Sequence, residues 1–314
     1  MTSLGARLES VFGRDRVQAN APLAPLTTFK VGGPAELLVE PRTSEEIVAA
    51  LTLAHDARVP VTLLGGGSNV LVSDNGVRGL VIRPRGGEIQ EGSDPSQGSD
   101  PGVVRADAAI TINGLVRWTI HHGCAGLEAW AGTPGTVGGA IFGNAHFGGR
   151  LIGEFVTGVR VASRDGHTRD LPADAMAFGY DRSRLQTSGE ILLSATFRVS
   201  RGDPATLRAT ARQSLAYRKG TQPLDTPSAG CIFQNPEGQS AGALVDRAGL
   251  KGVAVGGARV SPTHGNFIVN DGHATARDIR TLIERCRDAV RTKFGVDLRE
   301  EIVYLGEFDG DTGH

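Results

Sequence analysis

Residues 64–73 read LGGGSNVLVS, and this stretch decides the fold. A short apolar segment enters three consecutive glycines, and after Ser68 and Asn69 the β-type run VLV follows at 70–72. Glycines let the backbone turn at positive φ and come close to a ligand, and consecutive bare N–H groups can bind an anion. In a Rossmann site the glycine loop opens a helix, whereas here it leads into another extended segment. The stretch therefore predicts a phosphate-binding loop in a fold other than the Rossmann fold.

A second glycine-rich segment, residues 126–149, reads GLEAWAGTPGTVGGAIFGNAHFGG. Its TPGT and GG steps supply turns, hydroxyls and bare backbone, and Trp130 supplies one large flat apolar group. Two such loops favour a long ligand that is held at two places, and a dinucleotide with a pyrophosphate and a planar ring is one such ligand. A pair of purely structural turns is the alternative.

The bulk properties narrow the class of protein. A chain of 314 residues with 39% hydrophobic content is long enough for two or three domains. A formal net charge of −1 implies no polyanion-binding surface, so we expect no nucleic-acid partner. The three cysteines are widely spaced and suit a reducing cytosol, and they form no CxxC pair. We see no signal peptide and no apolar run of membrane-spanning length, and we expect a cytoplasmic protein with no membrane partner.

Strands and helices interleave without a strict βαβ repeat, which predicts an α+β fold. Strands are expected at residues 35–39, 61–64, 79–84, 103–106, 157–161, 190–199, 231–233 and 266–269. Helices are expected at residues 44–57, 112–122, 204–219, 241–248 and 275–295. Thr43 and Glu46 form a capping-box pattern, and Asp203 before Pro204 predicts a helix start. The polar tract 86–102, which contains GSDP twice, is expected to be a surface loop.

Ordered motifs along residues 20–306 resemble a known family. LGGGSNVLVSD at 64–74 and GTPGTVGGAIFGNA at 132–145 look like UDP-N-acetylenolpyruvoylglucosamine reductase, the MurB family of peptidoglycan synthesis. Further matching motifs follow this order along the chain: TTFKVGGPA at 27–35, QPLDTPSAGCIFQNP at 222–236, HGNFIVN at 264–270 and GVDLREEIVYLG at 295–306.

The resemblance implies a fold and a reaction. It implies a two-part FAD-binding region of the vanillyl-alcohol-oxidase (PCMH) type plus a C-terminal α+β substrate-binding domain, with expected limits at 1–84, 85–201 and 202–314. It also implies non-covalent FAD, NADPH as hydride donor and a small-molecule UDP-sugar substrate, UDP-N-acetylglucosamine enolpyruvate, which becomes UDP-N-acetylmuramate. Another FAD-dependent oxidoreductase of the same superfamily, or a non-catalytic flavin-binding homologue, is the alternative. We expect a monomer.

The resemblance also assigns roles to residues of this chain. Cys231 stands at the family's proton-donor position, where many relatives carry serine, and a thiol is acidic enough to give a proton. Glu301 matches the family's C-terminal glutamate, and its neighbour Glu300 points to the opposite face if the segment is a strand. Asn235 and Lys219 are candidates for binding the UDP-sugar. The expected FAD-binding residues are Gly65, Gly66, Gly67, Ser68, Asn69, Val70, Thr133, Pro134, Gly135, Thr136, Gly138 and Gly139.

The chain departs from the family pattern at two positions. The family's catalytic arginine lies in an FxYRxS motif, but residues 178–184 read FGYDRSR, which puts Asp181 at the arginine position. A carboxylate cannot replace a guanidinium as an anion clamp, so we predict that Arg182 takes the catalytic role, with Arg184 as the alternative. His146 stands where relatives usually carry glycine. No metal site is expected, since the adjacent His121 and His122 have no second ligand pair at metal spacing.

Overall fold

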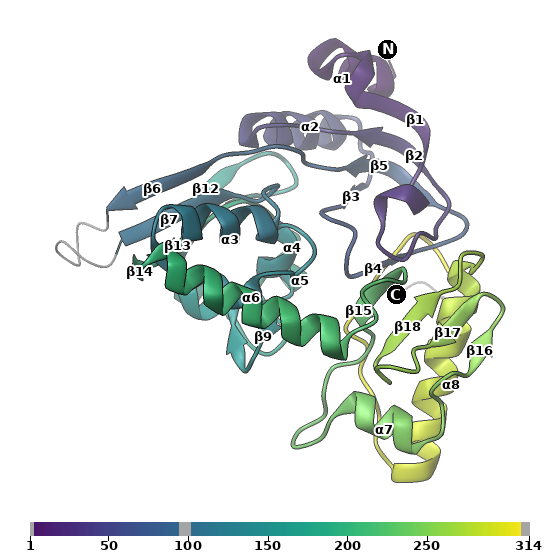
Figure 1. Cartoon of the computed structure of the whole chain (residues 1–314). Helices are drawn as coiled ribbons and strands as arrows, with labels where there is room; N and C mark the ends of the chain where they lie inside the picture. The colour runs from purple at the N-terminus through teal and green to yellow at the C-terminus, as the bar shows by residue number, and fades with distance from the viewer. Residues whose placement is uncertain (1–2, 94–101, 309–314) are drawn as a thin grey trace. The chain divides into compact units, whose positions relative to one another are not determined.

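The computed structural model describes residues 3–93 and 102–308 (Figure 1). The chain forms two compact units whose segments interleave along the sequence. Unit 1 comprises Met1–Ala19, Leu37–Gly66 and Gly79–Tyr217, and unit 2 comprises Asn20–Glu36, Gly67–Arg78 and Arg218–His314. The predicted limits at residues 84 and 201 between three domains stay predictions.

The helices that the structure describes are α1 Leu4–Phe12, α2 Ser44–Asp56, α3 Ile112–His121, α4 Val137–Phe142, α5 Leu185–Ser188, α6 Pro204–Thr221, α7 Ala241–Arg247 and α8 Ala276–Phe294. The strands up to the second glycine-rich segment are β1 Val17–Pro22, β2 Pro34–Val39, β3 Val61–Leu63, β4 Val70–Val72, β5 Val77–Ile82, β6 Ile89–Ser93, β7 Gly102–Asp107 and β8 Cys124–Ala125. The later strands are β9 His146–Phe147, β10 Arg150–Leu151, β11 Val156–Ala162, β12 Thr168–Pro172, β13 Ile191–Arg198, β14 Ser200–Arg201, β15 Ser228–Cys231, β16 Ala254–Val255, β17 Ala258–Val260, β18 Phe267–Asn270 and β19 Val303–Leu305.

Unit 1 is built on an antiparallel five-stranded sheet with the order β12-β11-β13-β7-β6. Helix α4 packs against β13 and β7, and α3 lies beside α4 (Figure 1). Trp130 and Phe197 are among the buried residues of the hydrophobic core that this sheet shares with its helices. A four-stranded sheet has the order β1-β2-β5-β3, in which β3 and β5 run parallel.

Unit 2 contains an antiparallel four-stranded sheet with the order β15-β18-β17-β16. Helix α8 packs along β16 and β17 and contacts α7 (Figure 1). The apolar face predicted for this helix is buried, at Ile279, Leu282, Ile283, Cys286 and Val290. A parallel pair, β19 with β4, joins the C-terminal motif to the segment after the first glycine loop.

Helix starts follow the predicted capping chemistry, because an oxygen side chain satisfies a first-turn N–H. Thr43 accepts from the Glu46 amide at 3.2 Å, and Asp203 Oδ2 accepts from the Thr206 amide at 2.9 Å. The Glu46 carboxylate accepts from the amide of Arg42 rather than from that of Thr43. The predicted capping box, which requires the bond to the Thr43 amide, is therefore incomplete.

Three local predictions are wrong. Residues 89–93, expected in a loop, form β6 and pair with β7, because their backbone completes the edge of the sheet; residues 94–101 of the same tract lie outside the described residues. The strand expected at 231–233 lies earlier, at β15. The glycines after Thr136 open a short helix, α4, rather than a turn.

Candidate active site

The two glycine-rich segments meet inside unit 1. A Cβ atom at Gly66 would lie 2.6 Å from the Gly135 Cα, and one at Gly65 would lie 2.9 Å from the Thr136 Oγ1. Gly135 itself has φ +99°, a conformation that side chains disfavour. The first loop therefore packs on the second, backbone against backbone, and no larger residue fits at their contact.

Neighbouring hydrogen bonds hold the second segment in place. Thr136 Oγ1 accepts from the Gly139 amide at 3.3 Å and so caps α4. The Gly138 amide donates to the Ala108 carbonyl at 2.9 Å, which ties the segment to the end of β7. Trp130, which the sequence offered as a flat contact for a ligand ring, is instead buried in the core and donates from Nε1 to the Ala145 carbonyl. The contact brings the glycine-rich backbones of both segments together, and the binding of an FAD pyrophosphate by these residues stays a prediction.

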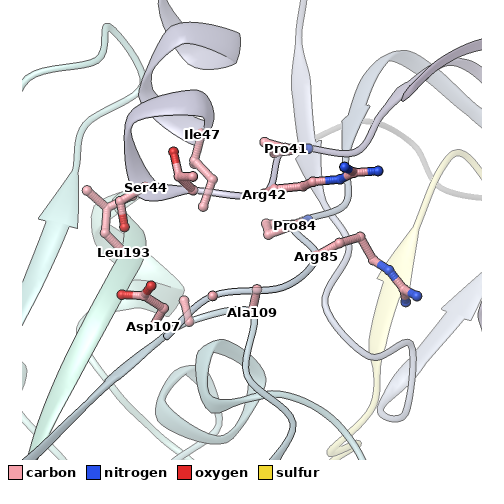
Figure 2. Close-up of a pocket in the computed structure, with 12 residues that line it drawn as sticks. Pro41, Arg42, Ser44, Ile47, Pro84, Arg85, Asp107, Ala109 and Leu193 are labelled. Carbon is pink, nitrogen blue, oxygen red and sulfur yellow. The ribbon is translucent and has the colours of Figure 1, made fainter. Parts of the chain in front are cut away.

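A small pocket lies at the start of α2, also within unit 1 (Figure 2). It is lined by Pro41, Arg42, Thr43, Ser44, Ile47, Pro84, Arg85, Gly87, Asp107, Ala108, Ala109 and Leu193. Figure 2 shows that Arg42 and Arg85 extend to one side, away from Asp107 and Leu193. Because Ala108 also accepts the Gly138 hydrogen bond, the pocket adjoins the second glycine segment.

The rest of the first glycine stretch, residues 67–70, belongs to unit 2 and is tied to the C-terminal motif. Asn69 Nδ2 donates to the Glu301 carbonyl at 3.2 Å, and the Val303 amide donates to the Asn69 carbonyl at 3.0 Å. Val70 pairs with Val303 in the parallel ladder of β4 and β19. Asn69 therefore orders the backbone that carries Glu301.

The backbone segments that carry Cys231 and Glu301, distant in sequence, pair with one another in unit 2. The Glu301 amide donates to the carbonyl of Ile232, the residue after Cys231, at 2.8 Å. Both side chains are half-buried. The neighbouring carboxylate, that of Glu300, accepts from Arg287 Nη1 at 3.0 Å.

A buried cation beside this pair was not predicted from the sequence. Arg218 is only 6% exposed, at the end of α6, and it interacts electrostatically with Cys231. Burial lowers the pKa of the Arg218 guanidinium to about 10, a shift that its electrostatic interaction with Cys231 opposes, so the group is still cationic at neutral pH. The sequence indicated its neighbour Lys219, which is exposed. The motif does not show which of Arg218 and Lys219 is buried. Successive helix residues point about 100° apart, and only the packing of α6 decides which of them faces inwards.

Asn235 has a local structural contact. Its Oδ1 accepts from the Ala241 amide at 2.9 Å, next to the Ser240 cap of α7. The side chain is exposed, so a role in binding the UDP-sugar stays a prediction.

The turn that replaces the family's arginine motif puts its charged residues in three different environments. Asp181 is buried and has φ +50°, and His146 Nδ1 lies 3.0 Å from its Oδ1. Arg182 is exposed. Arg184 is engaged elsewhere, with its Nε 2.8 Å from Glu190 Oε2, and Glu190 also bonds to Arg169. Although burial opposes ionisation, these hydrogen bonds hold the pKa of Glu190 at about 2.

The other two cysteines are core residues. Cys124 and Cys286 are buried, and burial raises the pKa of Cys124 and raises that of Cys286 to about 12. A thiol that resists ionisation is a poor nucleophile and acid, as expected from their apolar positions. Within residues 3–93 and 102–308 no group of three His, Cys, Asp or Glu side chains is placed to hold a metal ion. In the same ranges no helix combines the length and apolarity needed to cross a bilayer.

Comparisons with known proteins identify the families that this chain resembles. Residues 35–172 match the FAD binding domain family, and residues 222–305 match the C-terminal domain of UDP-N-acetylenolpyruvoylglucosamine reductase. The crystal structure of UDP-N-acetylenolpyruvylglucosamine reductase (MurB) from Thermus caldophilus is 34% identical, with a TM-score of 0.76, and the match covers 92% of this chain and 99% of that one. The fold and the match to the FAD binding domain family together define this protein as an FAD-binding oxidoreductase of α+β architecture.

Two curated relatives narrow the class to one family. The UDP-N-acetylenolpyruvoylglucosamine reductase of Myxococcus xanthus is 40% identical over 98% of this chain and 97% of its own length. The reductase of the same name from Synechococcus sp. (strain JA-3-3Ab) is 41% identical over 94% of this chain and 93% of its own. The chain belongs to the UDP-N-acetylenolpyruvoylglucosamine reductase family.

Proposed function

We propose that this chain reduces UDP-N-acetylglucosamine enolpyruvate to UDP-N-acetylmuramate, with FAD as a non-covalent cofactor and NADPH as hydride donor. The observation that carries the proposal is the pairing of the Cys231 and Glu301 segments beside the buried Arg218, in a chain similar over almost its full length to reductases of that name. The residues proposed to hold FAD are those at the two glycine segments, including Gly65, Gly66 and the TPGT turn.

Bound FAD supplies hydride transfer from NADPH to the terminal carbon of the enolpyruvyl group. The neighbouring carbon, which carries the carboxylate, must then accept a proton. Cys231 Sγ–H gives that proton and becomes a thiolate, which solvent reprotonates before the next turnover. Arg218 stabilises the negative charge that develops near the thiol, because a cation in a buried site interacts with it more strongly than in water. Glu301 assists protonation from the adjacent backbone segment.

The function is tested by separating the two half-reactions without oxygen. NADPH is expected to bleach the flavin absorbance of the purified protein, and UDP-N-acetylglucosamine enolpyruvate is then expected to restore it in stoichiometric amount. Flavin that stays reduced when this substrate is added contradicts the proposal and favours another flavoenzyme of the superfamily. A protein whose flavin NADPH does not reduce is instead a non-catalytic binder.

We also propose that the protein acts as a monomer in the cytoplasm, on a small-molecule substrate rather than on nucleic acid or a membrane. The net charge of −1 supports the absence of a polyanion partner. Light scattering of the purified holoenzyme tests the oligomeric state.

Arg182 and Arg184 are expected to respond differently to substitution by alanine. Because Arg182 is proposed to serve in place of the family's arginine, Arg182→Ala is expected to slow hydride transfer from the flavin to the enolpyruvyl substrate. It is expected to leave the free energy of unfolding unchanged, since the Arg182 side chain is exposed. Arg184→Ala is expected to lower the free energy of unfolding by about 2 kcal/mol, because it removes a hydrogen bond to a buried carboxylate. Urea unfolding and single-turnover kinetics measure the two effects.

The stability effect has a defined pH range. The pKa of Glu190 is lower in the folded protein than its ordinary 4.5, so its contribution is complete above pH 4.5 and is lost as the pH falls towards about 2. The Arg184→Ala protein is expected to lose less stability over this range than the wild type. Equal acid sensitivity of both proteins would exclude Arg184 as the cause of the low pKa.

A further inference from the structure

The backbone segment that carries Glu301 is held to the cysteine segment of unit 2 by a short pairing. The Glu301 amide donates to the Ile232 carbonyl at 2.8 Å, and the Gln234 amide donates to the Arg299 carbonyl at 2.9 Å. These bonds form an isolated antiparallel bridge, and the following strand, β19, pairs with β4 instead. So short a bridge fixes the side-chain directions only together with other contacts.

Glu300, at the centre of this bridge, faces α8. Its Oε1 accepts from Nη1 of Arg287, a residue of α8, at 3.0 Å. Its register partner Phe233 is buried in the hydrophobic core that includes the apolar face of α8, and register partners of an antiparallel pair project from the same face. Burial, together with a hydrogen bond to Glu300, raises the pKa of the Tyr304 hydroxyl, so the tyrosine is a neutral donor to the same carboxylate.

Cys231 lies on the opposite face of the sheet from α8. Its register partner in β18 is Phe267. The next residue of β18, Ile268, belongs to the core that includes Ile279 and Ile283 of α8. Because successive strand residues point to opposite faces, Phe267 and its partner Cys231 face away from the helix.

The same alternation places Glu301. It follows Glu300 in the bridge and therefore leaves the segment on the face away from α8, the face on which Cys231 lies. The other edge of the cysteine segment is held by Asn266, which accepts from the Phe233 amide at 2.9 Å and donates to the Phe233 carbonyl at 2.7 Å. The backbone between the two proposed catalytic groups is thus fixed, and Glu300 adds a charged anchor on the helix.

The exposure of the ion pair indicates an orienting contact more than a stabilising one. The Arg287 side chain is 40% exposed and the Glu300 side chain 20%. Ion pairs exposed to this extent contribute little to the free energy of unfolding. A charge-assisted hydrogen bond nevertheless restricts direction, and its support is a 19-residue helix that packs along β16 and β17.

We propose that Glu300 is a positioning residue: through its bond to Arg287 it fixes the segment so that the Glu301 carboxyl is presented on the face that carries Cys231. Glu300 itself neither gives nor accepts a proton in the reaction. The inference rests on the proposed function, and it adds a residue that acts on the second half-reaction through Glu301.

Anaerobic stopped-flow measurement of both half-reactions tests this role. Glu300→Ala is expected to lower the limiting rate of flavin reoxidation by UDP-N-acetylglucosamine enolpyruvate by about 10- to 100-fold, because a displacement of about 1 Å in a reacting group has an effect of this size. The half-saturating substrate concentration and the rate of flavin reduction by NADPH are expected to stay as in the wild type. Arg287→Ala is expected to act in the same way, and Arg287→Lys, which keeps the cation, is expected to retain most of the rate.

Arg259→Ala is the matched control. Arg259 forms another partly exposed ion pair of unit 2, with its Nη2 2.6 Å from Asp271 Oδ2, and its loss is expected to leave both half-reaction rates unchanged. A double-mutant cycle shows whether Glu300 acts through Glu301. In a Glu301→Gln background, Glu300→Ala is expected to cause no further slowing of reoxidation.

A second variant guards against poor folding of Glu300→Ala. Glu300→Gln keeps the side-chain volume but cannot form the ion pair, so it is expected to slow reoxidation while the midpoint of urea unfolding changes no more than in Arg259→Ala. An undiminished rate in both variants, a change confined to the half-saturating concentration, or equal slowing in the Glu301→Gln background overturns the role of Glu300 and leaves the proposed function intact. A wild-type flavin that NADPH reduces but this substrate does not reoxidise overturns the proposed function itself.

Discussion

Replacement of Cys231 by alanine is expected to slow reoxidation of the flavin by UDP-N-acetylglucosamine enolpyruvate by about 10²- to 10⁴-fold, the usual contribution of a positioned proton donor. Reduction of the flavin by NADPH is expected to keep its wild-type rate, because that step needs no proton from the thiol. Stopped-flow absorbance under anaerobic conditions measures the two steps separately.

Two further cysteine variants make the result specific. Cys231→Ser is expected to retain much more of the rate than Cys231→Ala, since a hydroxyl can still give a proton at the same place. Cys286→Ala removes a thiol from the core of unit 2 and is expected to lower stability while both half-reaction rates stay unchanged. If Cys231→Ala reoxidises at the wild-type rate, the proton comes from another group, and the half-buried Glu301 is the next residue to substitute.

Substitution Gly66→Ala is expected to yield protein with little bound flavin. The added methyl would lie 2.6 Å from the Gly135 Cα, so the two glycine segments must separate. Overpacking of this kind costs about 1–3 kcal/mol, and if the strain falls on the cofactor loops it weakens FAD binding by about tenfold or more. The flavin-to-protein absorbance ratio and the rise in melting temperature on addition of FAD measure the effect.

Gly143→Ala is the matched control for this substitution. Gly143 follows α4 in the same unit, but a methyl there meets nothing closer than the Gly139 carbonyl oxygen at 3.7 Å. It is expected to retain flavin like the wild type. A Gly66→Ala protein with full flavin content would mean that the contact between the two segments is structural and that FAD is held elsewhere.

The sequence predicts helix caps and amphipathic helix faces well, because these depend on interactions between residues close together in the chain. The caps at Thr43 and Asp203 and the apolar face of α8 depend on residues three or four positions apart, so the sequence displays them directly. The edge strand β6 was missed, because its polar composition resembles a loop and only pairing with β7 makes it a strand.

In the candidate site, too, local sequence predicts some features and only tertiary contacts determine others. Motif order along the chain is enough to identify the family, the cofactor and the residue types at Cys231 and Glu301, since each motif is local. The motifs do not show that Arg218 rather than Lys219 is buried near the thiol, because burial depends on which side of α6 faces the core. They also do not show that His146 and Asp181 are partners.

The amino-acid sequence alone was therefore sufficient for the fold class, the two glycine loops, the family and the expected reaction, since all of these are recorded in local patterns. Only the tertiary structure decided that the two loops pack backbone on backbone at Gly66 and Gly135, and that His146 bonds the aspartate standing at the family's arginine position. The physical reason is that such contacts join residues tens of positions apart, and their existence depends on how the sheets and helices bring those segments together.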